Sequence, residues 1–117
     1  MEDEDLSAAE VETFRQRLLS RREAVQAERV ASAADRRPVA LDQQSVGRLS
    51  RMDAMQQQAM AEALEVRRVQ ELRRIEAALR RVEAGVFGEC VRCGELIGRK
   101  RLDLDPTLPR CVACASS

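Results

Sequence analysis

The sequence predicts a mainly α fold: a long antiparallel two-helix coiled-coil hairpin followed by a small module held by four cysteines. Three observations support this. Two long segments repeat apolar residues at helical spacing. Aromatic residues make up only 2% of the chain and charged residues 34%, which is typical of long helices rather than of a large globular core. The cysteines occur as two Cys-x-x-Cys pairs close to the end of the sequence.

The first helix is predicted to begin at Ser7 and to end in the low thirties, after about 25 residues. Ser7 and Glu10 form a capping box, in which each side chain satisfies a backbone amide of the other residue. Pro38 cannot continue a helix and disfavours helical geometry at the residue before it. One narrow apolar stripe follows the capping box, comprising Val11, Phe14, Leu18 and Val25.

The second helix is predicted from about Leu41 or Ser45 to Ala84, and Gly85 is suited to the left-handed position that follows a helix. At about 1.5 Å per residue it is roughly 50 Å or more in length. The predicted apolar seam of this helix comprises Leu49, Met52, Ala59, Ala63, Val66, Val69, Leu72, Ile75, Leu79 and Val82.

Both stripes are too narrow for a globular core but suit a partner helix, so we expect the two helices to pack as a hairpin. The expected organisation has three parts. Residues 1–6 form an acidic tail, residues 7–85 form the hairpin with its tip at about 34–48, and residues 86–117 form the cysteine module. No apolar run reaches the roughly 20 residues needed to cross a bilayer, so we expect a soluble, cytoplasmic protein without a membrane segment.

The cysteine pairs have the spacing of a zinc ribbon, with Cys90 and Cys93 separated by seventeen residues from Cys111 and Cys114. Two such turns supply the four thiolates of a tetrahedral Zn²⁺ site. A module of this size usually needs a metal or disulfides to fold. Two disulfides in a secreted domain are the alternative, but no signal-peptide pattern is visible. We therefore predict one structural Zn²⁺.

The sequence argues against an enzyme. It contains no histidine, and four cysteine ligands leave the metal no open position for water. Paired carboxylates such as Asp103 and Asp105 are common on solvated surfaces. The basic cluster Arg99-Lys100-Arg101 is interpreted as solvated surface, and sequence-specific DNA binding is not expected. The formal net charge of zero gives no global attraction to nucleic acid.

A set of residues from position 87 onward forms a recognisable pattern around the cysteines: Phe87, Gly88, Cys90, Cys93, Gly94, Ile97, Arg101, Leu102, Pro106, Cys111 and Cys114. With these residues the sequence resembles the DksA/TraR family of bacterial zinc-finger proteins that bind RNA polymerase. The stretch leading to the finger, from Ile75 to Glu83, is also similar to that family.

The resemblance implies a transcription regulator that binds bacterial RNA polymerase directly. Its coiled-coil tip would enter the secondary channel and alter initiation at selected promoters. Some family members act jointly with the nucleotide ppGpp, which makes ppGpp a possible co-regulator here.

The tip departs from the family pattern. Well-studied members carry Asp-x-x-Asp-x-Ala there, and counting back from the finger places Gly47, Ser50 and Met52 at those positions. The acidic role is therefore assigned to Asp42 or Asp53, and we favour Asp53. The tip candidates for contact with polymerase are Asp42, Ser50, Arg51, Met52, Asp53 and Ala54.

Two other functions fit the same features. The first is a protein-interaction adaptor or homodimer, in which the apolar seam pairs between chains. The second is a redox or zinc sensor, because thiolates oxidise and then release metal.

Overall fold

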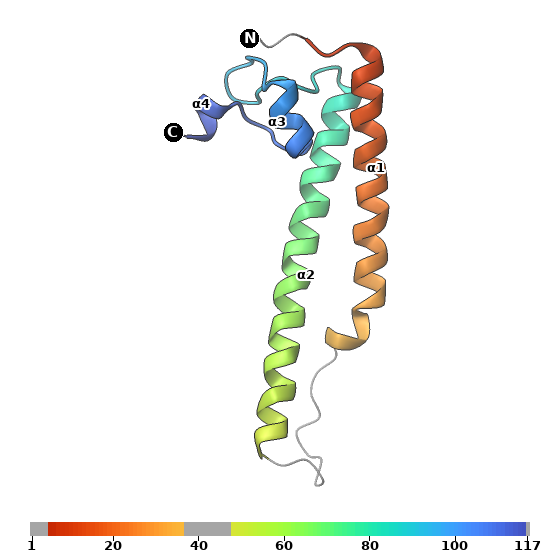
Figure 1. Ribbon diagram of the computed structural model, residues 1–117, viewed down its shortest axis with the longest axis vertical. Helices are drawn as coiled ribbons and strands as arrows, with labels where there is room; N and C mark the ends of the chain where they lie inside the picture. Colours follow the sequence, from red (N-terminus) through yellow and green to blue (C-terminus); the bar gives the residue numbers. More distant parts are fainter. Residues whose placement is uncertain (1–4, 37–47, 117) are drawn as a thin grey trace. The chain divides into compact units, whose positions relative to one another are not determined.

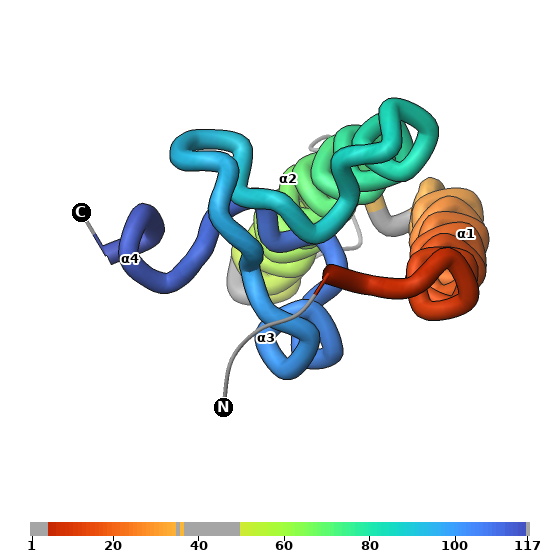
Figure 2. Tube along the Cα trace, turned by 90° about the horizontal axis from the view of Figure 1, so that it is seen from above, coloured from red at the N-terminus to blue at the C-terminus, as the bar shows by residue number. Residues whose placement is uncertain are grey.

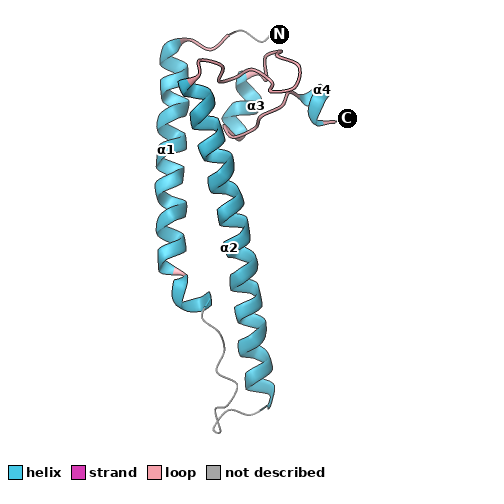
Figure 3. Ribbon diagram, turned by 180° about the vertical axis from the view of Figure 1, so that it is seen from behind, coloured by secondary structure: helices cyan, strands magenta, loops and turns pink. Residues whose placement is uncertain are grey.

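The computed structural model describes residues 5–36 and 48–116, without the side chains of residues 35, 48 and 49. The described residues form α1 (Ala8–Ala31), the 3₁₀ helix η1 (Ala33–Arg36), α2 (Arg48–Glu83), α3 (Arg99–Leu104) and α4 (Val112–Ala115). Figures 1 and 3 show α1 and α2 as two long helices side by side, and no strand among the residues described. The mainly α hairpin predicted from the sequence is confirmed.

Local signals set the helix ends as predicted. The Ser7 amide donates to Glu10 Oε1 at 2.8 Å, and the Glu10 amide donates to Ser7 Oγ at 3.1 Å, so the capping box is formed. At the end of α2, Gly85 has φ 78°, and the amides of Gly85 and Val86 donate to the carbonyls of Val82 and Arg81. This is the Schellman arrangement, which needs a residue with positive φ. The predicted start of the second helix, at Leu41 or Ser45, lies outside the described residues.

The chain divides into two compact units. The first unit comprises residues 1–23 and 72–117, and the second comprises residues 24–71. No helix among the described residues is long and apolar enough to span a bilayer.

The core of the first unit joins the start of α1, the end of α2 and the cysteine module. Leu18, Ile75 and Leu102 come from these three parts and are almost completely buried. Burying one such side chain contributes about 1.5–3 kcal/mol. The rings of Phe14 and Phe87 pack with centroids 5.6 Å apart. The remaining buried members of this core are Ala78, Leu79, Cys90 and Ile97.

In the second unit, ion pairs join α1 and η1 to α2. Arg29 and Arg36 both pair with Glu65, at 2.7 Å and 3.3 Å, while Arg68 pairs with Glu28 at 3.4 Å. The residue order of these pairs is that of antiparallel helices. Val25 is the fully buried apolar residue of α1 in this unit.

The predicted seam of α2 is wrong in the second unit. Met52 and Val66 are each 56% exposed, and Ala59 and Ala63 are exposed as well. The less exposed positions that follow one another at steps of three and four are Ala54, Gln58, Ala61, Glu65 and Arg68. The prediction followed the apolar residues, whereas the structure turns a largely polar face toward α1 because charged residues on α1 pair with it. Val69 is partly buried.

Candidate metal centre

The first cysteine pair lies on a tight turn after α2. The amide of Cys90 donates to the Glu95 carbonyl at 2.7 Å, and the amide of Gly94 donates to the Cys90 carbonyl at 2.9 Å. Gly94 has φ 78°, a conformation that favours glycine. An isolated antiparallel bridge between Glu89 and Leu96 closes the base of the turn. The sulfur atoms of Cys90 and Cys93 lie within 4.8 Å of each other.

The second pair is placed by the short helix α4. Cys111 is the residue before the helix, and its carbonyl accepts from the Ala115 amide at 2.9 Å, so Cys114 lies one turn later. The Val91 amide donates to the Pro109 carbonyl at 2.9 Å, which joins the two cysteine turns directly. Figure 2 shows the chain turning back from α2 through α3 to α4.

The four sulfur atoms converge. Each lies within 4.8 Å of the others, and Cys93 Sγ is 3.7 Å from Cys111 Sγ. With Zn–S bonds of about 2.3 Å, tetrahedral geometry places sulfurs about 3.8 Å apart. A disulfide needs a separation of about 2.05 Å, so the arrangement fits one zinc ion rather than a disulfide. Cys90 is buried and Cys93 is exposed.

The surroundings of Cys90 favour its thiolate. Burial raises the pKa of this thiol, but hydrogen bonds from the amides of Cys111, Cys93 and Arg92 outweigh burial and lower the pKa to about 6. The Arg92 amide lies 3.4 Å from Cys90 Sγ. Backbone amides that donate to ligand sulfurs are the usual outer-shell support of a zinc site.

The other sulfurs are crowded by one another. The hydrogen bond with Cys93, together with burial, raises the pKa of Cys114 to about 12. A dication among the four sulfurs relieves this crowding because it stabilises the ionised form of each one. The donor set of four thiols therefore fits Zn²⁺. It fills a tetrahedral shell, so the chemistry that zinc supplies here is structural.

Ion pairs hold the module against α1. Arg17 donates to Asp103 Oδ1 at 3.3 Å and to the Asp103 carbonyl at 2.8 Å, and Arg99 pairs with Glu10. The pair of carboxylates noted in the sequence is thus used for structure. Asp103 binds Arg17, and Asp105 accepts from the Thr107 amide at 3.0 Å and hydroxyl at 2.7 Å.

The basic cluster is also partly committed to internal contacts. Besides the pair between Arg99 and Glu10, Arg101 donates to the Arg110 carbonyl at 3.1 Å, while Lys100 is exposed.

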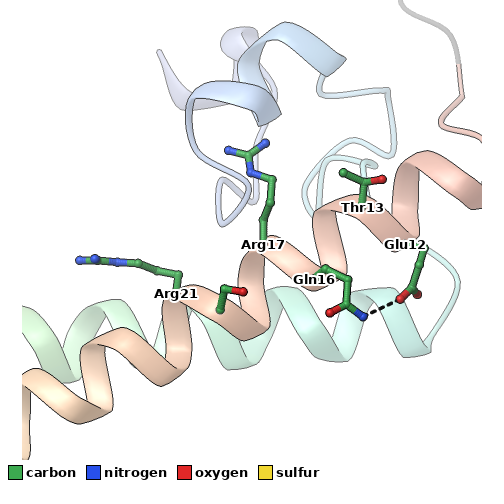
Figure 4. Close-up of a pocket in the computed structure, with 6 residues that line it drawn as sticks. Glu12, Thr13, Gln16, Arg17 and Arg21 are labelled. Carbon is green, nitrogen blue, oxygen red and sulfur yellow. Dashed lines mark hydrogen bonds between the residues drawn. The ribbon is translucent and has the colours of Figure 1, made fainter.

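One open hollow on α1, of about 660 Å³, is lined by polar residues from Glu12 to Arg21. Figure 4 shows Arg17 pointing away from α1 there, and its guanidinium is the one that binds Asp103.

The tip candidates lie apart from the cysteine cluster in sequence and on another element. Ser50 to Ala54 occupy the first two turns of α2, where Asp53 is exposed and Ala54 is partly buried. Asp42 lies outside the described residues. The sequence reasoning missed the charged cluster around Glu65. A signal for it was present, because Gln58 and Glu65 are seven residues apart and therefore lie on the same face of α2.

The geometry defines a class of protein: a helical hairpin carrying a zinc finger with four cysteine ligands. Residues 85–117 match the family model described as the prokaryotic dksA/traR C4-type zinc finger. The chain is 42% identical over 43 residues to the RNA polymerase-binding transcription factor DksA of Haemophilus influenzae, and 46% identical over 44 residues to an uncharacterized protein of Aquifex aeolicus. These alignments cover 37% and 38% of this chain.

The chain spans 30% of the length of each of these two relatives. Similarity extends further in structure. The solved structure of transcription factor DksA2 from Pseudomonas aeruginosa matches with a TM-score of 0.77 and 28% identity, covering 94% of this chain and 83% of that chain. Residues 85–117 thus resemble the four-cysteine zinc finger of the DksA/TraR family, which holds one structural zinc ion, and the fold is similar to that of DksA2.

Proposed function

We propose that this chain is a DksA-like transcription regulator that binds bacterial RNA polymerase directly and is not an enzyme. The observation that carries the proposal is the likeness to DksA2, which covers 94% of the chain and therefore includes the hairpin as well as the finger. A relative that is 42% identical to this chain over 43 residues is named as an RNA polymerase-binding transcription factor. The site of action would be the cytoplasm, where the polymerase is.

In this proposal Cys90, Cys93, Cys111 and Cys114 ligate the zinc ion and anchor the base of the hairpin. The tip inserts into the secondary channel of the polymerase and modulates initiation. Asp53 supplies the acidic group at the tip, because it is the exposed carboxylate within the first two turns of α2. Joint action with ppGpp belongs to the same proposal.

In vitro transcription tests the proposal. Zinc-loaded protein should associate with core polymerase at micromolar concentration and change the output of initiation, whereas a chain lacking residues 40–54 should change neither. Asp53→Asn should keep binding within about twofold and lose most of the transcriptional effect, because a tip residue acts after docking. Glu83→Gln, at the other end of α2, is the matched control. Absence of association, or an unchanged effect after the deletion, would contradict the proposal.

A second function is favoured by one observation. Three apolar side chains of α2 in the second unit, those of Met52, Met60 and Val66, are more than half exposed, so the described residues do not cover them. An adaptor or homodimer would cover them with another helix. Light scattering separates the two functions: a stable dimer with no affinity for polymerase would favour the second. The thiol-sensor hypothesis stays a prediction.

A further inference from the structure

The corner between α1 and η1 is held by two side chains of α2. Arg36 in η1 pairs with Glu65 at 3.3 Å, and Arg68 donates to Ser32 Oγ at 3.1 Å. Glu65 and Arg68 are three residues apart, so they lie on one face of α2. Figure 1 shows η1 turning from the end of α1 toward α2. We call Ser32, Arg36, Glu65 and Arg68 the corner latch.

The corner latch also completes the end of α1. The last carbonyl groups of a helix have no partners within the helix. Here the Arg29 carbonyl accepts from the Arg36 guanidinium at 2.9 Å and from Ser32 Oγ at 3.3 Å. A positive charge is favourable at this place because the C-terminus of a helix carries a partial negative charge. The guanidinium of Arg36 therefore caps α1 and binds α2 at the same time.

Apolar packing does not fix this corner. Val25 is the only buried apolar side chain of the second unit among the residues described, and it lies nearly two turns before the end of α1. The side chains of Arg36 and Glu65 are 25% and 15% exposed, so their ion pair is largely removed from water. Such pairs often add less stability than apolar residues of similar size, but their bonds have fixed partners and directions. The corner latch is therefore suited to selecting one arrangement of η1.

The corner latch lies at the base of the tip. Arg36 is the last residue described before the tip segment, and α2 begins at Arg48. Glu65 is twelve residues from Asp53, or about 18 Å along α2, so it does not touch the acidic group assigned to the tip. An effect of the corner latch on the tip must therefore act through the position of η1.

We propose that Glu65 and Arg68 are positioning residues, which hold η1 and thereby fix the point at which the chain leaves α1 for the tip. This role rests on the proposed function, in which the tip acts on initiation after docking. Loosening the corner latch should leave docking intact, because the finger and the buried core around Ile75 belong to the other compact unit. It should reduce the effect on initiation, because a smaller fraction of the bound protein would present the tip in its active arrangement.

Hydrogen exchange and in vitro transcription test the two halves of the proposal on zinc-loaded, full-length protein. Arg36→Gln removes the ion pair with Glu65 but leaves Glu65 paired with Arg29. Amides of residues 32–36 should then exchange on the order of five- to tenfold faster, while those around Ile75 should not change. The dissociation constant for core polymerase should stay within about twofold, and the effect on initiation at saturating protein should fall by about threefold or more.

Arg22→Gln is the matched control. It breaks an ion pair of the same kind between α1 and α2, with Glu76 at 2.9 Å, in the other compact unit. This variant should leave the exchange of residues 32–36 and the effect on initiation unchanged, whereas Arg68→Gln, which releases Ser32, should act in the same direction as Arg36→Gln. Circular dichroism checks that each variant is folded.

The outcomes separate the corner latch from the proposed function. Unchanged exchange in Arg36→Gln would mean that Glu65 does not hold η1, and the inference would be wrong. Faster exchange with an unchanged effect at saturation would also overturn it, because the corner latch would then only stabilise the corner. An equal loss of effect in Arg22→Gln would overturn the positioning role as well. If the wild type neither binds polymerase nor alters initiation, the proposed function fails and the positioning role fails with it, whereas exchange still measures the hold on η1.

Discussion

The carboxylate of Glu65 on α2 lies 2.7 Å from the guanidinium of Arg29 on α1, in the part of the hairpin where an apolar seam was expected. The same oxygen also pairs with Arg36 at 3.3 Å. The Glu65 side chain is only 15% exposed, and its other oxygen, Oε1, has no hydrogen-bond partner among the described residues. One carboxylate thus connects α2 to two arginines, one in α1 and one in η1.

This pairing predicts how stability depends on pH. The hydrogen bond from Arg29 lowers the pKa of Glu65 below its usual value of 4.5. The ionised Glu65 carboxylate therefore stabilises the folded state above about pH 4.5, and this stabilisation is lost as the pH falls through the lower pKa of the folded state. Glu65→Gln should lower the melting temperature at pH 7. Between roughly pH 5 and pH 3, the melting temperature of this variant should fall less than that of the wild type. Glu62→Gln, one turn away and exposed, is the control, and equal acid profiles of wild type and Glu65→Gln would contradict the prediction.

The capping box at Ser7 predicts a local loss of stability. Ser7→Ala removes the acceptor of the Glu10 amide and should reduce the free energy of unfolding by about 1 kcal/mol. Urea denaturation followed by circular dichroism measures the change. Ser20→Ala, at an exposed position inside α1, should be neutral or slightly stabilising because alanine favours the helix interior. A loss at Ser20 as large as at Ser7 would count against the cap.

The two parts of α2 predict different costs for shortening an apolar side chain. Ile75 is fully buried, so Ile75→Ala should cost about 2–5 kcal/mol by leaving a cavity. Val66 was expected in the seam but is 56% exposed, and Val66→Ala should change stability by no more than about 0.5 kcal/mol. Denaturant midpoints compared at equal slope give both values. A large loss of stability in the monomeric Val66→Ala variant would instead support the apolar seam predicted from the sequence.

The sulfur cluster predicts one zinc ion per chain. Cys90→Ser removes a ligand and should weaken zinc binding by more than about 100-fold, since even outer-shell changes cost about 10–100-fold. The module should lose its fold while most of the helical signal remains, because α1 and α2 also have contacts of their own. Metal analysis and far-UV circular dichroism measure the two effects. Val91→Ala, an exposed change within the same turn, should keep the metal, and full zinc occupancy in Cys90→Ser would exclude Cys90 as a ligand.

Several features could be predicted from the sequence because they depend on contacts within a few residues. The capping box at Ser7 and the glycine after α2 are local hydrogen-bond patterns, and both are formed. The cysteine spacing indicated a cluster because a Cys-x-x-Cys turn has few ways to point both sulfurs, and the four sulfurs do converge.

The tertiary structure decided which face of α2 packs against α1 in the second unit. Apolar periodicity alone favoured Met52 and Val66, but the free energy of that contact depends on the charges of the opposite helix, which a single-helix pattern does not contain. Arg29 and Arg36 supply those charges and turn Glu65 inward. By the same reasoning, only the structure showed that Glu76 on α2 pairs with Arg22 on α1, because an ion pair between two helices depends on how they pack and not on the spacing along one of them.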